Sequence, residues 1–253
     1  MDYAIALVGA VLAGAVNTLS GNGSAITLTI LMELLGLPAN VANGTNRVGV
    51  LGNGFAASLG FQRAGRLAVK KEERKEMTHV VVITTLGAVL GIYLSLIISN
   101  EAYRAVFRYL LIVMLIVVLV KPKRWLVASE GRPVLPQWVS IPLYFALGIY
   151  GGFIQMGMGV FFLAIMVLVA RYEIIQANVI KALVVTAYTL IAVAIFSWQG
   201  LIDWPIGLLM AAGQMIGGYL TARFASQHPK AGLYAYRLLI IVIIAAIAKA
   251  FFF

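Results

Sequence analysis

The sequence contains no cysteine and few charged residues, and each shortage excludes a class of protein. Without cysteine the chain has no disulfide, no thiolate metal ligand and no thiol-based redox chemistry. Only 11% of its 253 residues are charged, whereas soluble domains carry about 25%. The composition therefore excludes a soluble domain. The net charge of +10 is better explained by basic cytoplasmic loops of a membrane protein than by nucleic-acid binding.

Acidic residues and histidines are also too sparse for catalysis. The aspartates are Asp2 and Asp203, and both lie near the ends of apolar segments. There is no His-Glu-x-x-His motif and no Ser/His pair deep within an apolar segment. Hydrolytic and redox chemistry therefore lack their usual groups. We expect no enzyme, no cofactor and no metal site.

Long apolar runs make up most of the chain, which is 62% hydrophobic. Two apolar segments, 24–37 and 159–170, would be only about 21 and 18 Å long as helices, too short for a hydrocarbon core of about 30 Å. Each follows a glycine break, which predicts a hairpin that enters the membrane, unwinds near its middle and leaves on the same side. We expect an all-α polytopic membrane protein with ten segments, at 3–20, 24–37, 40–60, 78–98, 104–120, 138–156, 159–170, 174–197, 203–224 and 232–252.

The second half of the chain repeats the first. The breaks read GNGS at 21–24 and GMGV at 157–160, and several other positions recur in the same order. The matching positions are Ala42-Asn43 with Ala177-Asn178, Phe61 with Phe196, Gly65 with Gly200, and Gly87-x-x-x-Gly91-x-Tyr93 with Gly213-x-x-x-Gly217-x-Tyr219. We expect a first repeat at 1–121, a cytoplasmic linker at 122–137 and a second repeat at 138–253. The two Gly-x-x-x-Gly motifs are typical of helix packing.

Basic residues predict the orientation in the membrane. They concentrate in the loops 61–77 and 121–132 and around 225–231, whereas the loops 98–103 and 198–202 contain no Lys or Arg. Placing the basic loops in the cytoplasm satisfies the positive-inside rule and puts both termini outside. With five segments per copy, the second copy enters from the opposite side. The repeats are then inverted, as in alternating-access carriers.

Arg47 and Lys181 are basic residues that lie deep inside apolar segments. Each is seven residues into its segment, about 10 Å deep, where a cation costs about 3 kcal/mol or more without a partner or a wet cavity. We expect them to face one cavity that binds a small anion. Polar residues on the same segments join the predicted binding site: Asn43, Thr45, Asn46 and Asn178.

The glycine breaks supply the other half of the predicted site. A helix that begins inside the membrane has N–H groups without intrahelical partners and a positive dipole end, both of which suit an oxyanion. Glycine lets the backbone approach the ligand closely, and Ser24 could cap the helix or donate a hydroxyl. The predicted ligand-binding residues of the breaks are Gly21, Asn22, Gly23, Ser24, Gln155, Gly157 and Gly159.

Each feature also has a simpler interpretation. Arg47 could pair with Glu33, the only acid expected to be buried within the apolar segments, as a structural ion pair; otherwise Glu33 is a candidate for proton coupling. Lys181 could extend its ammonium to the cytoplasmic interface. The glycine breaks could serve helix packing alone. These alternatives stay open at the level of sequence.

Three stretches resemble a known family. The run AGAVNTLSGNGSAITLTILMELLGLPANVANGTNRVGVLGN, the later LGIYGGFIQMGMGVFFLAIMVL and the turn GLIDWP are similar to the sulfite exporter TauE/SafE family over essentially the whole chain. Three departures stand out: GNGS replaces a run of glycines, Met156 and Met158 flank the second break, and Asn178 and Lys181 replace a small Thr/Ser helix start. The residues carried over are Gly21, Gly23, Thr45, Asn46, Gly157 and Gly159.

The resemblance implies a multi-pass carrier of the bacterial inner membrane for sulfite, sulfoacetate or other organosulfonates. An anion channel would suit the same cations, and small carboxylates are an alternative cargo. A non-transporting membrane subunit is a further alternative. The sequence leaves open the direction of transport, coupling to protons or sodium, and whether the chain forms a homodimer. Its expected partners are a small anion and the lipid bilayer, not nucleic acid.

Overall fold

A computed structural model describes residues 2–66, 71–99, 135–153 and 155–228, with scattered positions from 102 to 119 and from 230 to 248. Every element that it describes is a helix, which confirms the all-α fold. The helices are α1 (Asp2–Ser20), α2 (Gly23–Thr29) with its π-helical continuation η1 (Ile30–Leu34), α3 (Ala39–Arg63), α4 (Lys71–Ile97), α6 (Gln137–Phe153), α7 (Met158–Ala164) with its continuation η3 (Ile165–Val169), α8 (Ile174–Trp198) and α9 (Trp204–Gln227). The predicted segments 104–120 and 232–252 and most of the linker 122–137 lie largely outside the described residues.

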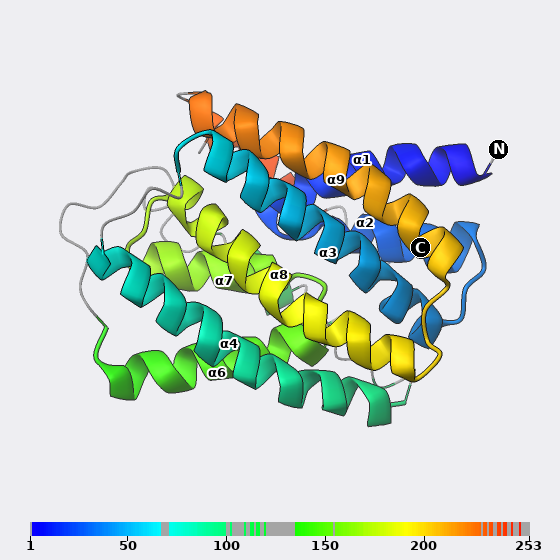
Figure 1. Cartoon of the computed structure of the whole chain (residues 1–253), viewed down its shortest axis with the longest axis horizontal. Helices are drawn as coiled ribbons and strands as arrows, with labels where there is room; N and C mark the ends of the chain where they lie inside the picture. The colour runs from blue at the N-terminus through cyan, green and yellow to red at the C-terminus, as the bar shows by residue number, and fades with distance from the viewer. Residues whose placement is uncertain are drawn as a thin grey trace.

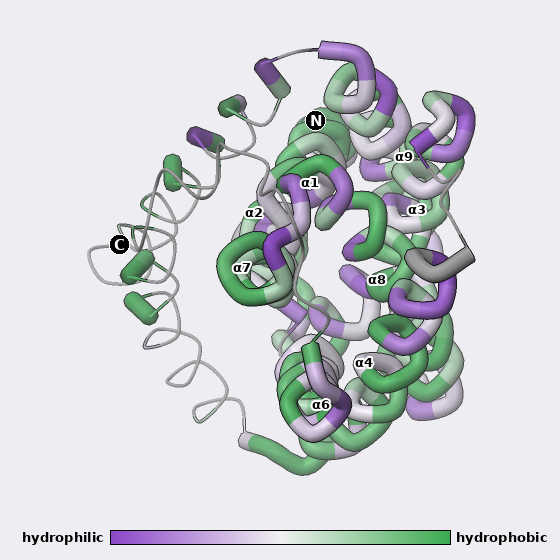
Figure 2. The backbone as a smooth tube through the Cα atoms, turned by 90° about the vertical axis from the view of Figure 1, so that its left-hand side faces the viewer, coloured by the Kyte–Doolittle hydropathy of each residue, from purple (hydrophilic) through white to green (hydrophobic). Residues whose placement is uncertain are grey.

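The lengths of the helices fit a membrane protein. Among the described residues, Asp2–Ser20, Arg74–Ile97 and Ile174–Trp198 are long and apolar enough to span a bilayer, whereas Gly23–Met32 and Met158–Val169 are shorter apolar helices. Large apolar side chains lie exposed on the long helices, such as Tyr93 and Leu190, and the hydrophobic colour extends over α4, α6 and α7 in Figure 2. Lipid explains this exposure, because water would oppose it. The chain is a multi-pass membrane protein.

The helices of the two halves interleave. Helix α9 of the second half packs against both α1 and α3, and α4 of the first half packs against both α6 and α8, while α3 and α8 pack against each other. The order of neighbours is therefore α1, α9, α3, α8, α4 and α6 (Figure 1). The order is symmetric about the contact between α3 and α8. Counted outward from that contact, α3 corresponds to α8, α9 to α4, and α1 to α6.

The two Gly-x-x-x-Gly motifs pack helices at equivalent places, as predicted. A Cβ atom on Gly91 of α4 would lie 2.0 Å from the carbonyl oxygen of Ile149 in α6. A Cβ atom on Gly217 of α9 would lie 2.0 Å from the carbonyl oxygen of Val11 in α1. Only glycine allows these backbones to approach so closely.

Helices α3 and α8 also end in the same turn. Gly65 and Gly200 follow them with φ of +75° and +67°, and the next residues donate to Phe61 and Phe196 respectively. These are positions that the sequence comparison paired. The shared turn supports a duplication, while the opposite orientation of the copies in a membrane stays a prediction.

One boundary differs from the expectation. A loop was expected at 61–77 and the next helical segment at 78–98, but α3 ends at Arg63 and α4 begins at Lys71. Lys71, Arg74 and Lys75 therefore lie on the first turns of a helix. Lys, Glu and Arg are strong helix formers, so this stretch extends α4 beyond its apolar part.

Candidate functional site

The two glycine breaks meet. Helices α1 and α2 form one hairpin and α6 and α7 form another, and in Figure 1 α2 and α7 extend to opposite sides of the centre. At the tips, a Cβ atom on Gly21 would lie 2.4 Å from the Cα atom of Gly159, and one on Gly159 would lie 2.3 Å from the Cα atom of Gly21. Gly21 also has a φ of +77°. The tips therefore touch backbone to backbone, which requires glycine on both sides.

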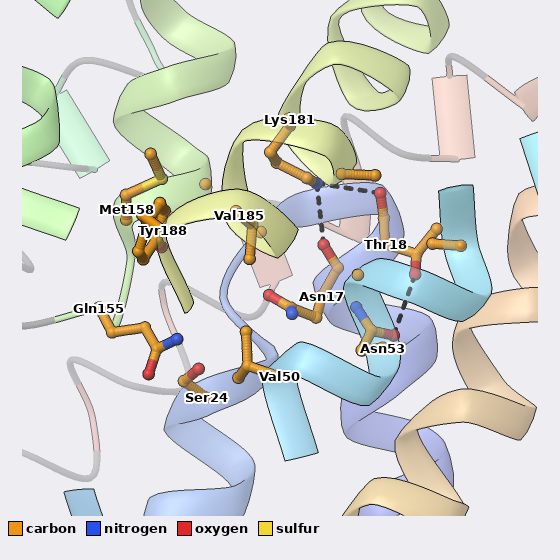
Figure 3. Close-up of a pocket in the computed structure, with 15 residues that line it drawn as sticks. Asn17, Thr18, Ser24, Val50, Asn53, Gln155, Met158, Lys181, Val185 and Tyr188 are labelled. Carbon is orange, nitrogen blue, oxygen red and sulfur yellow. Dashed lines mark hydrogen bonds between the residues drawn. The ribbon is translucent and has the colours of Figure 1, made fainter. Parts of the chain in front are cut away.

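A small pocket lies beside this contact. Asn17 and Thr18 of α1, Ser24 of α2, Asn53 of α3 and Lys181 of α8 contribute polar groups to its wall, together with Gln155 at the second break (Figure 3). None of the described residues that line it is acidic. Its volume is about 20 Å³, and a cavity needs about 10–15 Å³ to hold one water molecule. In this conformation the pocket is thus narrow and has space for about one water.

Lys181 supplies the positive charge of the pocket and is 4% exposed. Its Nζ atom donates to the carbonyl oxygens of Asn17 (2.8 Å) and Thr18 (3.0 Å) and to Oδ1 of Asn178 (2.5 Å). Figure 3 shows the ammonium pointing at the end of α1. An ammonium has three donors, so all three are used within the protein. Lys181 is held inside the fold rather than extended to the interface.

Arg47 lies on α3, is fully buried and is not among the residues that line the pocket. Its Nη2 donates to the carbonyl oxygen of Gly152 at 2.7 Å, near the end of α6, and its guanidinium lies 4.8 Å from the centre of the Phe196 ring. The two cations were expected to face one cavity. Instead, Lys181 binds carbonyls at the end of α1, the helix before the first glycine break. Arg47 binds a carbonyl near the end of α6, the helix before the second glycine break.

The predicted site residues divide into two groups. Those that line the pocket are Gly21, Ser24, Gln155, Gly159 and Lys181. Those that are buried outside its lining are Asn22, Gly23, Asn43, Thr45, Asn46, Arg47, Gly157 and Asn178. The side chain of Glu33 lies outside what the structure describes, and so does its predicted pairing with Arg47.

Several residues of the second group hold the fold around the breaks. Thr27 donates to Oδ1 of Asn46 and so ties α2 to α3. Thr45 accepts from the backbone N–H of Asp203 at 2.9 Å. Asn178 donates to the carbonyl oxygen of Leu19 at 3.2 Å. These bonds position the walls of the pocket without facing it.

Ser24 does not cap the second helix. The residue at the N-cap of α2 is Asn22, and no side-chain hydrogen bond caps this end. Ser24 is 3% exposed and lies in the pocket wall beside Gln155 (Figure 3). Because α2 begins at Gly23, Ser24 is already inside the helix, where its hydroxyl cannot take the capping position.

Sequence reasoning missed Asn17, Thr18, Asn53 and Tyr188 as lining residues. One of them carried a signal, because Asn53 follows Asn46 by two helical turns on the same apolar segment, which places both on nearly the same face. The amide of Asn53 is best oriented with its nitrogen donating to the carbonyl oxygens of Gly14 and Gln214, each at 3.0 Å. It thereby connects α3 with α1 and α9.

The model of the family "Sulfite exporter TauE/SafE" matches residues 6–250. The chain belongs to this family. The predicted resemblance is confirmed, and it covers nearly the whole length.

Similar proteins carry matching descriptions. A "Probable membrane transporter protein ORF9" of Sinorhizobium is 29% identical over 88% of this chain and 82% of its own length. A "Probable membrane transporter protein" of Haemophilus influenzae is 25% identical over 85% and 82%. A "Probable membrane transporter protein YfcA" of Escherichia coli K12 is 26% identical over 85% and 77%. No solved structure matches the chain. Family and relatives together identify a membrane transporter.

Proposed function

We propose that this membrane transporter is a secondary carrier for small sulfur-containing anions, such as sulfite, sulfoacetate or other organosulfonates. It would work by alternating access in the bacterial inner membrane, with both termini outside. The observation that carries the proposal is the buried ammonium of Lys181 in the wall of a polar pocket at the contact between the two glycine breaks.

The electrostatics of this pocket favour an anion. A charged group inside a membrane protein acts through a low dielectric, so its field is weakened far less than in water. No described lining residue is acidic, and the polar side chains opposite Lys181 are neutral. The hydroxyl of Ser24 and the amide of Gln155 offer donors at the tips of the two hairpins. Because Lys181 donates all its protons to oxygens of the protein, it would attract the substrate by charge rather than by a direct hydrogen bond.

The small volume of the pocket supports alternating access. A volume of about 20 Å³ has no room for a sulfonate, so the tips at Gly21 and Gly159 would have to separate on one side at a time. The interleaved order of helices gives the two halves equivalent positions on either side of this contact. If the two hairpins are inverted and meet at the midplane, movement of one would open the pocket to one face of the membrane. The equivalent movement of the other would open it to the opposite face.

The proposal is tested by uptake into proteoliposomes that contain the purified chain. Labelled sulfite and sulfoacetate are expected to enter saturably, and an internal load of the same anion should accelerate entry. Malonate is the matched competitor, because it differs from sulfoacetate only by a carboxylate in place of the sulfonate. Competition by sulfoacetate but not malonate supports the sulfonate class. Stronger competition by malonate would instead indicate a carboxylate carrier.

Controls separate the carrier from the alternatives. Single-channel currents without counter-transport would indicate a channel, and absence of flux with every anion would contradict a carrier. Lys75 of α4 is exposed and far along the chain from the breaks, so Lys75→Ala should transport like the original chain. Transport that survives Arg47→Ala combined with Lys181→Ala would contradict the proposed role of the buried cations.

A further inference from the structure

The oxygens around Lys181 form a small cage. Two of them are backbone carbonyls of the last turn of α1, from Asn17 and Thr18, and the third is the side-chain oxygen of Asn178. The nitrogen of the same Asn178 amide donates to the carbonyls of Leu19 and Ile174, at 3.2 and 3.0 Å. These two bonds turn its oxygen toward Nζ. The cage is thus fixed from both sides, by α1 and by α8.

Such a cage has the chemistry of a site for a monovalent cation. The last carbonyls of a helix carry the negative end of its dipole. The Asn17 carbonyl also accepts from the backbone N–H of Gly21 at 3.0 Å, which leaves its second lone pair for a cation. In carriers built from interrupted helices, ends of this kind coordinate Na⁺ beside the substrate. Here all the described groups around the cage are neutral oxygens and amides, and no described pocket-lining carboxylate offers an alternative partner for the cation.

We propose that the ammonium of Lys181 permanently fills a monovalent-cation site formed by the end of α1 and Asn178. A cation tethered to α8 stays with the protein when the substrate leaves. On this proposal neither transport by the original chain nor its unfolding depends on Na⁺, and removal of the Lys181 side chain opens a site that accepts Na⁺ or a small ammonium ion.

The equivalent place in the other half is filled differently. At the end of α6 the carbonyl of Gly152 accepts from the guanidinium of Arg47, which also lies over Phe196. A guanidinium is planar and broad, whereas an ammonium is a compact point charge. A small spherical ion can replace the second but not the first. The cation site is therefore specific to Lys181.

The experiment compares thermal unfolding of the purified full-length chain and of Lys181→Ala in choline, sodium and methylammonium chloride at equal ionic strength. The original chain should unfold at one temperature in all three salts. The variant should unfold earlier in choline, and Na⁺ or methylammonium should raise its Tm saturably by about 2–4 °C, as expected for a ligand that binds only the folded state. Lys75→Ala is the control, because its lysine is exposed, and its Tm should not depend on the cation.

Three outcomes would overturn the proposal. They are a Tm of the original chain that rises with Na⁺, a Lys181→Ala variant that is equally unstable in all three salts, or uptake by the original chain that requires Na⁺. Should Lys181→Ala fail to fold, Lys181→Met retains the bulk of the stem without its charge and is tested in the same salts. If neither variant folds, the two measurements on the original chain still decide.

The uptake measurement rests on the proposed function, whereas the unfolding measurements do not. If no anion is transported but Lys181→Ala is rescued by Na⁺, the cation site stands and the proposed carrier function fails. If anions are transported only in the presence of Na⁺, the carrier function stands and the cation site fails.

Discussion

Replacing Gly21 with alanine is expected to force apart the tips of the two hairpins. The new Cβ atom would lie 2.4 Å from the Cα atom and 2.5 Å from the carbonyl carbon of Gly159. Relief to an ordinary contact near 3.4 Å requires the backbones to separate by 3.4 − 2.4 = 1.0 Å. Overpacking of this kind costs about 1–3 kcal/mol. The φ of +77° adds about 1–2 kcal/mol for a residue with a Cβ atom, so the total is about 2–5 kcal/mol.

Gly36 provides the matched control. Its φ is +68°, and a Cβ atom there would meet nothing within 4 Å, so Gly36→Ala carries the conformational cost alone, about 1–2 kcal/mol. The difference between the two variants is then about 1–3 kcal/mol. For a chain of this size that corresponds to a Tm about 2–12 °C lower for Gly21→Ala. The assay is thermal unfolding of the purified proteins in detergent, followed by uptake into proteoliposomes.

Gly159→Ala isolates the contact from the backbone strain. Gly159 lies within α7, where alanine would normally stabilise the helix by about 1 kcal/mol. The Cβ atom would nevertheless lie 2.3 Å from the Cα atom of Gly21, so a net loss of stability and of transport is expected. If Gly159→Ala were more stable than the original chain, or if Gly21→Ala unfolded at the same temperature as Gly36→Ala, the direct contact between the tips would be refuted.

Three further substitutions test other parts of the fold. Asp203 caps α9 by accepting from the N–H of Ile206 at 3.1 Å. Asp203→Ala should therefore lower the free energy of unfolding by about 0.5–2 kcal/mol, whereas Asp203→Asn should lose little. Equal Tm values for the two variants would argue against the cap. Arg47→Ala removes a charged hydrogen bond and a cation–π contact and should cost about 2–5 kcal/mol. Unfolding in detergent should place Arg47→Lys between Arg47→Ala and the original chain, and an unchanged Tm in Arg47→Ala would contradict this. Gly217→Ala places a Cβ atom 2.0 Å from the carbonyl oxygen of Val11 and should lower the Tm by loosening α1 from α9, as unfolding in detergent would show. Gly200→Ala, whose Cβ atom meets nothing within 4 Å, should lose only about 1–2 kcal/mol, the cost of its φ of +67°.

Local features of the fold could be predicted because they depend on neighbouring residues. Apolar length separates a spanning helix from a short one, and the short helices at Gly23–Met32 and Met158–Val169 follow the glycine breaks as expected. The Gly-x-x-x-Gly motifs packed helices as predicted, because two small residues one turn apart leave a groove for another backbone. The largest boundary error, at Lys71, came from reading charge as a loop although those residues favour helix.

The sequence by itself therefore determined the class of protein, the positions of the breaks and the presence of buried cations. Only the tertiary structure decided what those cations touch. Lys181 binds a carbonyl 164 positions earlier in the chain and Arg47 one 105 positions later. Membrane helices are apolar on all sides, so their sequence pattern does not show which face meets which neighbour. The packing of α9 between α1 and α3, and of α8 beside both, brings each cation to the other half's helix end.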